Sequence, residues 1–374
     1  MGPGLVYGLI TSRMPAMKAQ TGAHEAEIGY VLLAFGLSAL VGLTVSSSLI
    51  RRFSSRRVLQ VCCLGMLLVL PLTGSMQTPL TFGLASVLMG IFMGFVDVAM
   101  NAQAIQLEQR FAAPCLALMH GTYSLGGLLG ALSGALFSSF GISPFLHFCA
   151  VMALYAVLLP RVMPRLQRDR VITSREEEAE RSRRHRLSMP PLLVMLFGVL
   201  AACCYAAEGT VGEWGALYLF TVKGAGEETA ALVYACFAVT TLCCRMTADM
   251  ARTHFSDFTL ALTGALLAVI GMSTVLAADA VALCLLGYAC MGFGMAPLVP
   301  LCFSRAGQIP GVSPSEASAV VSVMGYGGLL MFPPIIGNVA HAFGLGKALY
   351  IALGLVLIIA AGSALFRCGR RAAS

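Results

Sequence analysis

Ionisable side chains inside long apolar runs are the residues of this sequence best suited to chemistry. Asp97 stands about three-quarters of the way through the apolar run 80–104, and Asn101 follows one helical turn later on the same face. An ionised side chain at membrane depth costs about 2.5–3.5 kcal/mol on insertion scales, so it marks a candidate site. Such a carboxylate could bind and release protons near neutral pH. The alternative is that Asp97 and Asn101 only hydrogen-bond neighbouring helices.

A second group of candidates lies further along the chain. Glu208 follows Tyr205 by about one turn, and Trp214 comes soon after. Trp at the end of a span is typical of a membrane-belt anchor, but its glycine-rich setting also suits stacking against a sugar. Arg13 lies at the end of the first segment, in the region that corresponds to the outer part of the segment with Glu208. We therefore expect Arg13 to pair with Glu208 or Glu213.

His120 and Tyr123 are further candidates in the run that holds them. His120 lies near one end of its run, where solvation is cheap, so a plain solvated histidine is the alternative to a proton carrier. The 13 cysteines lie mostly inside apolar runs, where they are expected to be buried apolar side chains. No nucleophile–base set, P-loop or metal-ligand spacing is present, so we expect neither an enzyme nor a bound metal or cofactor.

The composition predicts that these residues are held by membrane-spanning helices. Of the 374 residues, 58% are apolar and only 11% are charged, against about 25% charged in soluble domains. The apolar runs approach the 20 or so residues that a helix needs to cross the bilayer. Twelve segments result, at about 4–11, 28–50, 58–75, 80–104, 115–138, 144–159, 190–211, 230–247, 258–277, 280–303, 317–339 and 348–366.

The basic residues give these segments an orientation. If the polar stretch 161–189 is cytoplasmic, only Arg13, Lys18, Lys223 and Lys347 of the 24 Lys and Arg residues lie outside. This distribution follows the positive-inside rule. The net charge of +7 therefore indicates topology, and no nucleic-acid partner is expected. We predict a multi-pass protein of the bacterial inner membrane whose linker and C-terminus are cytoplasmic.

The two halves of the sequence resemble each other at an offset of about 202 residues. Met89-Gly90 matches Met291-Gly292, and the sequence Gly-Gly-Leu-Leu occurs at 126–129 and at 327–330. Because six crossings return the chain to the same side, the repeats are expected to be parallel, related by an axis along the membrane normal.

The repeat also divides the chain. We expect a first six-helix bundle over 1–160, a charged linker over 161–189 and a second bundle over 190–374. The seventh segment begins near Pro190, so its counterpart would begin about twelve residues before Met1. We therefore expect the first helix to lack its cytoplasmic end.

Four stretches carry a resemblance to a known family. They are residues 12–18, 97–101, 208–219 and 297–300. With them the chain resembles the major facilitator superfamily and, within it, the bacterial inner-membrane YbjJ-like branch. The resemblance implies a monomeric secondary transporter that moves a small solute by alternating access, without ATP.

The resemblance also implies a gate in the loop after the second helix. That loop usually reads like Gly-x-x-x-Asp-Arg-x-Gly-Arg-Arg. Here serines replace both glycines and Arg51 replaces the acidic residue, while the basic tail remains. The candidate gating residues are Arg51, Arg52, Arg56, Arg57, Arg245 and Asp249. Arg245 and Asp249 are spaced i, i+4, so they can meet on one helical face. The alternative is a charge cluster that only sets topology.

The favoured function is proton-coupled transport of a small polar solute, such as a sugar or related metabolite, because sugar–proton symporters of the family also carry a carboxylate in the fourth helix. Drug efflux is an alternative, although its antiporters usually carry an Arg there and a Gly-Pro element in the fifth helix. This chain has Asp97 and no proline between Pro114 and Pro144. A membrane sensor that kept the fold without transport is the third possibility.

Overall fold

The computed structural model describes residues 1–111, 116–167, 191–312 and 314–367. Within these ranges the side chains of residues 47, 105, 108–111, 116–120, 248–249 and 314–315 are not described. Throughout the described ranges the chain folds into helices and short connections, without a strand. This confirms the predicted all-helical membrane fold.

The N-terminal half, residues 1–167, contains the first set of helices. They are α1 (Gly2–Ser12), α2 (Met14–Thr21), α3 (Glu25–Phe53), α4 (Ser55–Ser75), α5 (Pro79–Phe111), α6 (Leu116–Ser139), α7 (Pro144–Val162) and the short η1 (Met163–Arg165). The predicted first span at 4–11 lies within α1, which ends at Ser12, and Pro15 stands in the first turn of the next helix. Proline is favoured there because its missing N–H has no helical partner in a first turn.

The C-terminal half, residues 191–367, contains the second set. It comprises α9 (Leu192–Thr221), α10 (Glu227–Ala230), α11 (Leu232–His254), α12 (Asp257–Ala277), α13 (Val281–Met295), α14 (Leu298–Ala306), α15 (Pro314–Phe343), α16 (Leu345–Ala348), α17 (Tyr350–Gly362) and η2 (Ser363–Arg367). In the described residues, 10 helical segments are long and apolar enough to cross a membrane. The pair α1–α2 and helix α6 occupy the two remaining predicted spans.

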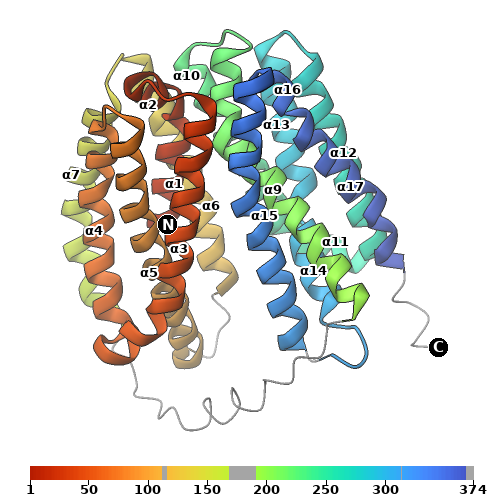
Figure 1. The fold of residues 1–374 in the computed structure, drawn as a ribbon. Coiled ribbons are helices and arrows are strands. Elements are labelled where there is room, and N and C mark those ends of the chain that lie inside the picture. Colours follow the sequence, from red (N-terminus) through yellow and green to blue (C-terminus); the bar gives the residue numbers. More distant parts are fainter. Residues whose placement is uncertain (112–115, 168–190, 313, 368–374) are drawn as a thin grey trace.

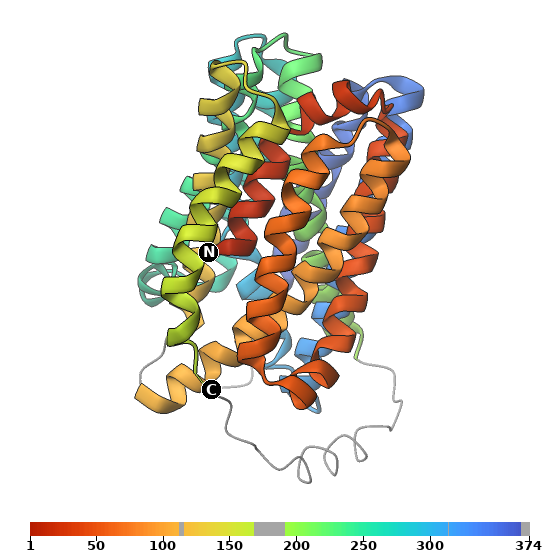
Figure 2. The same ribbon diagram turned by 90° about the vertical axis from the view of Figure 1, so that its left-hand side faces the viewer.

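The two halves stand side by side with their long helices running in the same general direction (Figure 1). We call the end where α7 finishes and α9 starts the linker face, and the other end, where α2, α10 and α16 lie, the opposite face. Figure 2 looks onto the N-terminal half and shows the N-terminus about midway between these two ends. The predicted linker over 161–189 lies mostly outside the described residues.

Side-chain caps set the ends of several spans. His24 caps α3 through a capping box, in which its Nδ1 accepts from the backbone N–H of Glu27 at 3.3 Å and its own N–H donates to Oε2 of Glu27 at 3.0 Å. Ser143 and Ser256 accept in the same way at the starts of α7 and α12. These bonds satisfy backbone donors that a helix start leaves unpaired.

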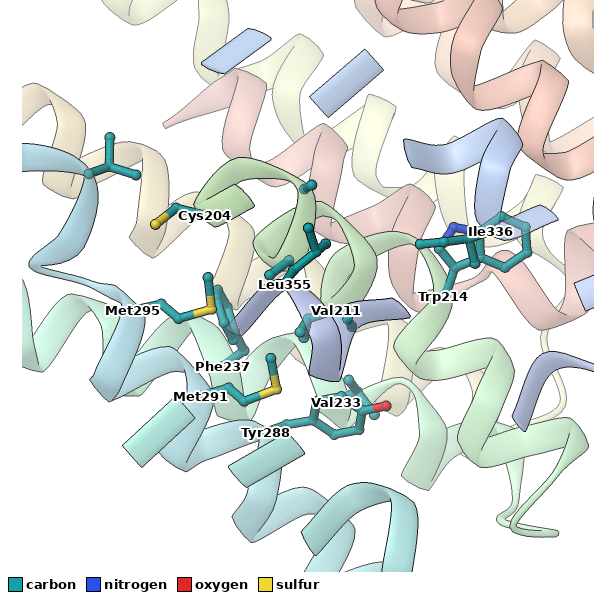
Figure 3. Close-up of a cluster of buried hydrophobic side chains, with 14 of the residues drawn as sticks. Cys204, Val211, Trp214, Val233, Phe237, Tyr288, Met291, Met295, Ile336 and Leu355 are labelled. Carbon is teal, nitrogen blue, oxygen red and sulfur yellow. The ribbon is translucent and has the colours of Figure 1, made fainter. Parts of the chain in front are cut away.

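The C-terminal half is built around α9, which is buried over most of its length. Its Cys204, Val211 and Trp214 pack in one cluster with Phe237 of α11 and Met291 of α13 (Figure 3). Small side chains and flexible methionines allow these helices to pack closely. The described cysteines are all free, as their apolar settings predicted.

Candidate functional site

Tyrosines from both halves lie where the halves face each other. Tyr7 of α1 lies edge-on to Tyr234 of α11, with ring centroids 5.2 Å apart and planes at 69°. Tyr205 of α9 stacks with Tyr326 of α15 at 6.0 Å. Tyr123 of α6 lies within electrostatic reach of Tyr326. The phenols form a polar and aromatic layer inside an otherwise apolar bundle.

Glycines on facing helices make room for these rings. The hydroxyl of Tyr7 lies directly over Gly212 of α9. Across the interface, a Cβ on Gly127 of α6 would come within 2.8 Å of Cε1 of Tyr234. Tyr7 and Tyr234 therefore each occupy a space that the other half leaves open. A larger residue at either glycine would push the halves apart.

Glu208 of α9 is the carboxylate at the centre of this layer. Its Oε1 is buried and makes no hydrogen bond with the described residues. The charge of Arg245 on α11 acts on Glu208, and the same arginine donates from Nη1 to Oγ of Ser124 on α6 at 3.5 Å. Arg245, predicted as a gating residue, thus connects both halves beside the predicted Glu208.

Asp97 is half-buried on α5, and Asn101 is half-buried one turn further on. The carboxylate of Asp97 acts electrostatically on Tyr123 and Tyr326, which come from opposite halves. The structure therefore brings Asp97, Tyr123, Tyr205 and Glu208 to one region. Their roles in coupling and recognition stay predictions.

Glu213 is a second buried carboxylate on α9, with a side chain only 9% exposed. It forms no hydrogen bond or ion pair with the part of the chain that the structure describes. Its charge acts on Tyr7, and Oε2 lies 3.9 Å from where a Cβ on Gly209 would stand. This is an ordinary van der Waals distance, and the tight neighbour of such a Cβ is Cδ1 of Leu329 at 2.9 Å.

The predicted pairing of Arg13 with Glu208 or Glu213 is wrong. Arg13 is 2% exposed and places Nε 3.3 Å from Oε1 of Glu227 in α10. It also donates to Oγ of Ser138 and, at 2.5 Å, to the carbonyl of Ile142. Arg13 stands at the end of α1, above the tyrosine layer. It therefore joins the halves at the opposite face.

The membrane-belt interpretation of Trp214 is also wrong, and its stacking against a sugar stays a prediction. Its side chain is 0% exposed, and Figure 3 shows it in the buried hydrophobic cluster together with Ile336 of α15. It therefore does not lie at the lipid interface. Its Nε1 has no hydrogen-bond partner among the described residues.

Two of the predicted residues have side chains outside the described set. His120 belongs to α6 and Asp249 to α11, but their side chains are not described. The predicted pairing of Asp249 with Arg245 therefore stays a prediction.

The basic gate residues of the first half make contacts within their own half in the part of the chain that the structure describes. Arg51 donates to Ser48 at 3.0 Å and Arg56 to the carbonyl of Pro164 at 3.3 Å, while Arg52 lies over the ring of Phe53. Arg57 is exposed. Among side chains that the structure describes, no carboxylate pairs with this group.

A charge cluster that the sequence analysis missed lies on the linker face of the second half. Asp257 at the start of α12 pairs with Arg252 of α11 at 3.4 Å and with Arg305 of α14 at 2.8 Å. The i, i+5 spacing of Arg252 and Asp257 around a helix break was its available signal. This cluster ties three helices of one half together.

The halves also make close contacts at the opposite face. The rings of His24 and His341 stack at 4.3 Å, and the hydroxyl of Tyr30 lies 3.2 Å from Oδ1 of Asn338. A Cβ on Gly29 would approach the carbonyl oxygen of Pro333 to 2.7 Å. Helices α3 and α15 are thus in backbone contact at this face.

Comparison with known proteins agrees with this geometry. Residues 4–310 match the sequence profile of the Major Facilitator Superfamily. The membrane protein MosC of Rhizobium meliloti is 32% identical over 370 residues, covering 97% of this chain and 87% of MosC. An uncharacterized MFS-type transporter of Yersinia pestis is 28% identical over 350 residues, covering 94% of this chain and 89% of the relative.

Solved structures share the fold at low sequence identity. The nucleoside transporter NupG superposes with a TM-score of 0.74 at 14% identity, covering 98% of this chain and 97% of the other. A D-xylose-proton symporter gives 0.71 at 17% identity, over 98% of this chain and 95% of the other. The profile match and the relatives together show that the chain belongs to the major facilitator superfamily and is a membrane transporter of that family.

Proposed function

We propose that this transporter couples the movement of a small polar solute, such as a sugar or related metabolite, to a proton flux by alternating access. The observation that carries the proposal is the polar layer between the halves, in which Glu208 and Asp97 lie among tyrosines and beside Arg245. Carboxyl groups at this depth are costly, so those that are present are candidates for binding or proton transfer.

Phenol rings and hydroxyls suit a polyhydroxylated solute. Tyrosine offers an apolar face for the C–H surface of a sugar ring and a hydroxyl that both donates and accepts. Tyr205, Tyr234 and Tyr326 supply this chemistry from one half, and Tyr7 and Tyr123 supply it from the other. The names of the structural neighbours, a nucleoside transporter and a xylose–proton symporter, favour the same class of solute.

The alternating movement follows from where the halves touch. Contacts between Arg13 and Glu227 and between His24 and His341 hold the opposite face together. We infer that these contacts break when the halves rock about the tyrosine layer. The contact between Arg245 and Ser124, which also joins the halves, changes in the same movement. The layer then faces each side in turn.

We further place the protein in the bacterial inner membrane as a monomer, with the linker and C-terminus in the cytoplasm, on the distribution of Lys and Arg. The motifs at 97–101 and 297–300 support assignment to the YbjJ-like branch.

The test begins with the purified chain in detergent. A thermal-stability screen over sugars, nucleosides, organic acids and amino acids identifies ligands, because a bound ligand raises apparent stability by mass action. A stabilising solute is then supplied to proteoliposomes with an imposed pH gradient. Accumulation that collapses with a protonophore supports the proposal. Equal uptake with and without the gradient contradicts proton coupling, and expulsion driven by the gradient identifies an efflux antiporter instead.

A further inference from the structure

A cavity of about 320 Å³ lies in the second half and extends from the linker face as deep as Arg245. Its walls come from α11, α12 and the consecutive helices α13 and α14. Leu260, Thr263 and Gly264 of α12 face Pro297 and Leu301 across it. It lies toward the linker face, where α11 ends and α12 begins.

The cavity exists because the tenth span is broken. Helix α13 ends at Met295 and α14 starts at Leu298, with Pro297 between them. Proline lacks the N–H that would continue the helical ladder. Gly264 and Gly294 bring α12 and α13 into backbone contact just beside this break. The chain diverges from α12 beyond that contact and leaves the space open.

The surroundings of the cavity are apolar and exposed. Phe293, which lines it, is 47% exposed, and Ile270 on the adjoining surface of α12 is 59% exposed. In a membrane protein such side chains contact hydrocarbon. The medium next to the cavity is therefore the acyl region of the bilayer, so an apolar chain is the occupant that this position favours.

One end of the cavity carries positive charge. Arg252 is among its lining residues, and Arg252 and Arg305 share the carboxylate of Asp257, which leaves an excess of one positive charge among these three residues. Arg245 lies two turns deeper along the same face of α11 and also lines the cavity. Among the described residues that line it, none is acidic. The charge is complementary to a phosphate group at the membrane surface.

We propose that this cavity binds one anionic phospholipid, with an acyl chain between α11 and α12 and the headgroup phosphate on Arg252. The inference is independent of the solute that the transporter moves. Two features distinguish this site from an ordinary lipid-facing groove. The space lies beside a helix break, and Arg252, which belongs to a group with excess positive charge, lies at its end.

The experiment uses the full chain in detergent. Native mass spectrometry and thermal unfolding are measured with added dioleoylphosphatidylglycerol, dioleoylphosphatidylcholine or glycerol 1-phosphate. Phosphatidylglycerol should bind and stabilise, phosphatidylcholine should bind at least about tenfold more weakly because it carries no net charge, and glycerol 1-phosphate should have no effect because it has no chain.

Two substitutions test the two ends of the site. Arg252→Gln should weaken phosphatidylglycerol binding about tenfold by removing a charge-assisted contact, whereas Arg252→Lys should retain most of it. Thr263→Trp should fill the cavity and abolish binding. Thr274→Trp is the matched control, because Thr274 lies three turns away on the same face of α12 and bonds its own helix as Thr263 does.

A third substitution separates a specific headgroup contact from diffuse surface charge. Arg161→Gln removes an exposed arginine from the same membrane face, at the end of α7, and should leave binding unchanged. Equal binding of both phospholipids would overturn the proposal, as would stabilisation by glycerol 1-phosphate alone. Equal losses in Thr263→Trp and Thr274→Trp, or in Arg252→Gln and Arg161→Gln, would also overturn it. If Arg252→Gln does not fold, the Thr263 and Thr274 pair decides alone.

Discussion

Nε of Arg13 lies 3.3 Å from Oε1 of Glu227, and these two residues belong to opposite halves of the protein. Arg13 is buried and also hydrogen-bonded to Ser138 at the end of α6 and to Ile142 just beyond it. Its guanidinium is therefore held by the N-terminal half as well as by Glu227. The ion pair therefore acts as a joint at the opposite face. Any movement that opens this face has to separate the two charges.

Replacing Glu227 with Gln should weaken this joint. We expect a loss of about 1.5–3 kcal/mol in the free energy of unfolding, because the guanidinium stays buried while its charged partner is gone. Hydrogen exchange measured by mass spectrometry should increase in α10 and at the end of α1. Unchanged exchange there would show that the pair does not hold the face closed.

Lys18→Gln is the control for this substitution. Lys18 pairs with Glu25 at 3.2 Å, but both residues belong to the N-terminal half and are more exposed than Arg13. Its loss should cost less than about 1 kcal/mol. Exchange in α10 should stay at the level of the unsubstituted protein.

The stacked histidines give a second prediction about the same face. His24→Ala removes both the cap of α3 and the stack on His341, and should cost about 1–2 kcal/mol of stability. His24→Asn should cost less, because Asn is a good N-cap and only the stack is lost. The stabilities are measured by thermal or chemical unfolding in detergent.

A double-mutant cycle separates the two contributions. If the stack matters, His24→Asn and His341→Ala should be non-additive by about 0.5–1 kcal/mol. Additive effects would mean that the rings are neighbours without energetic coupling. In that case the stability of His24→Asn should equal that of the unsubstituted protein, because Asn replaces His24 as the N-cap.

Much of the fold was predictable because it follows from the apolar runs. A run of about 20 residues in lipid has to satisfy its own backbone, so it forms a helix. The runs at 258–277 and 80–104 accordingly appear as α12 and α5. The break between α13 and α14 was not predicted from the run at 280–303, although Pro297 is visible in the sequence.

The site was harder to predict because its residues meet only through packing. Asp97 and Glu208 stand out in sequence as rare charges, and the structure places both in the tyrosine layer. Tyr7 and Tyr234 were missed because a tyrosine in an apolar run resembles an ordinary core aromatic. Their signal was a glycine on a facing helix, which sequence spacing alone does not pair with them. Glu227 was missed because it lies in a loop-like segment outside the predicted span.

The packing of the Tyr234 ring against Gly127 gives a third prediction. Gly127→Ala would place a Cβ 2.8 Å from the ring, so the ring or the half has to move. We expect a stability loss of about 1–3 kcal/mol and a lower transport rate once a solute is identified. Gly121→Ala on the same helix is the control, because no atom of the described residues lies within 4 Å of its added Cβ. That change should be neutral or stabilise by about 0.5–1 kcal/mol. Equal effects of both substitutions would contradict this packing.

The last prediction concerns coupling through Asp97. Asp97→Asn keeps the shape of the side chain and mimics its protonated form, so the transporter can cycle but cannot release a proton there. Counterflow exchange of solute should survive, while accumulation driven by an imposed pH gradient in proteoliposomes should fall at least about tenfold. Asp97→Ala should additionally weaken solute binding if the carboxylate touches the solute. Thermal unfolding checks that both variants remain folded.

Glu208→Gln distinguishes Asp97 from the other central carboxylate. The charge of Glu208 acts on Tyr205, and the charge of Arg245 acts on Glu208, so its loss should weaken binding and lower exchange and accumulation together. Separation of exchange from accumulation only in Asp97→Asn would assign the proton to Asp97. If Asp97→Asn accumulates solute fully, the coupling role is refuted and Asp97 is a packing residue beside Asn101. A separation seen only in Glu208→Gln would move the proton site to α9, within reach of the charge on Arg245.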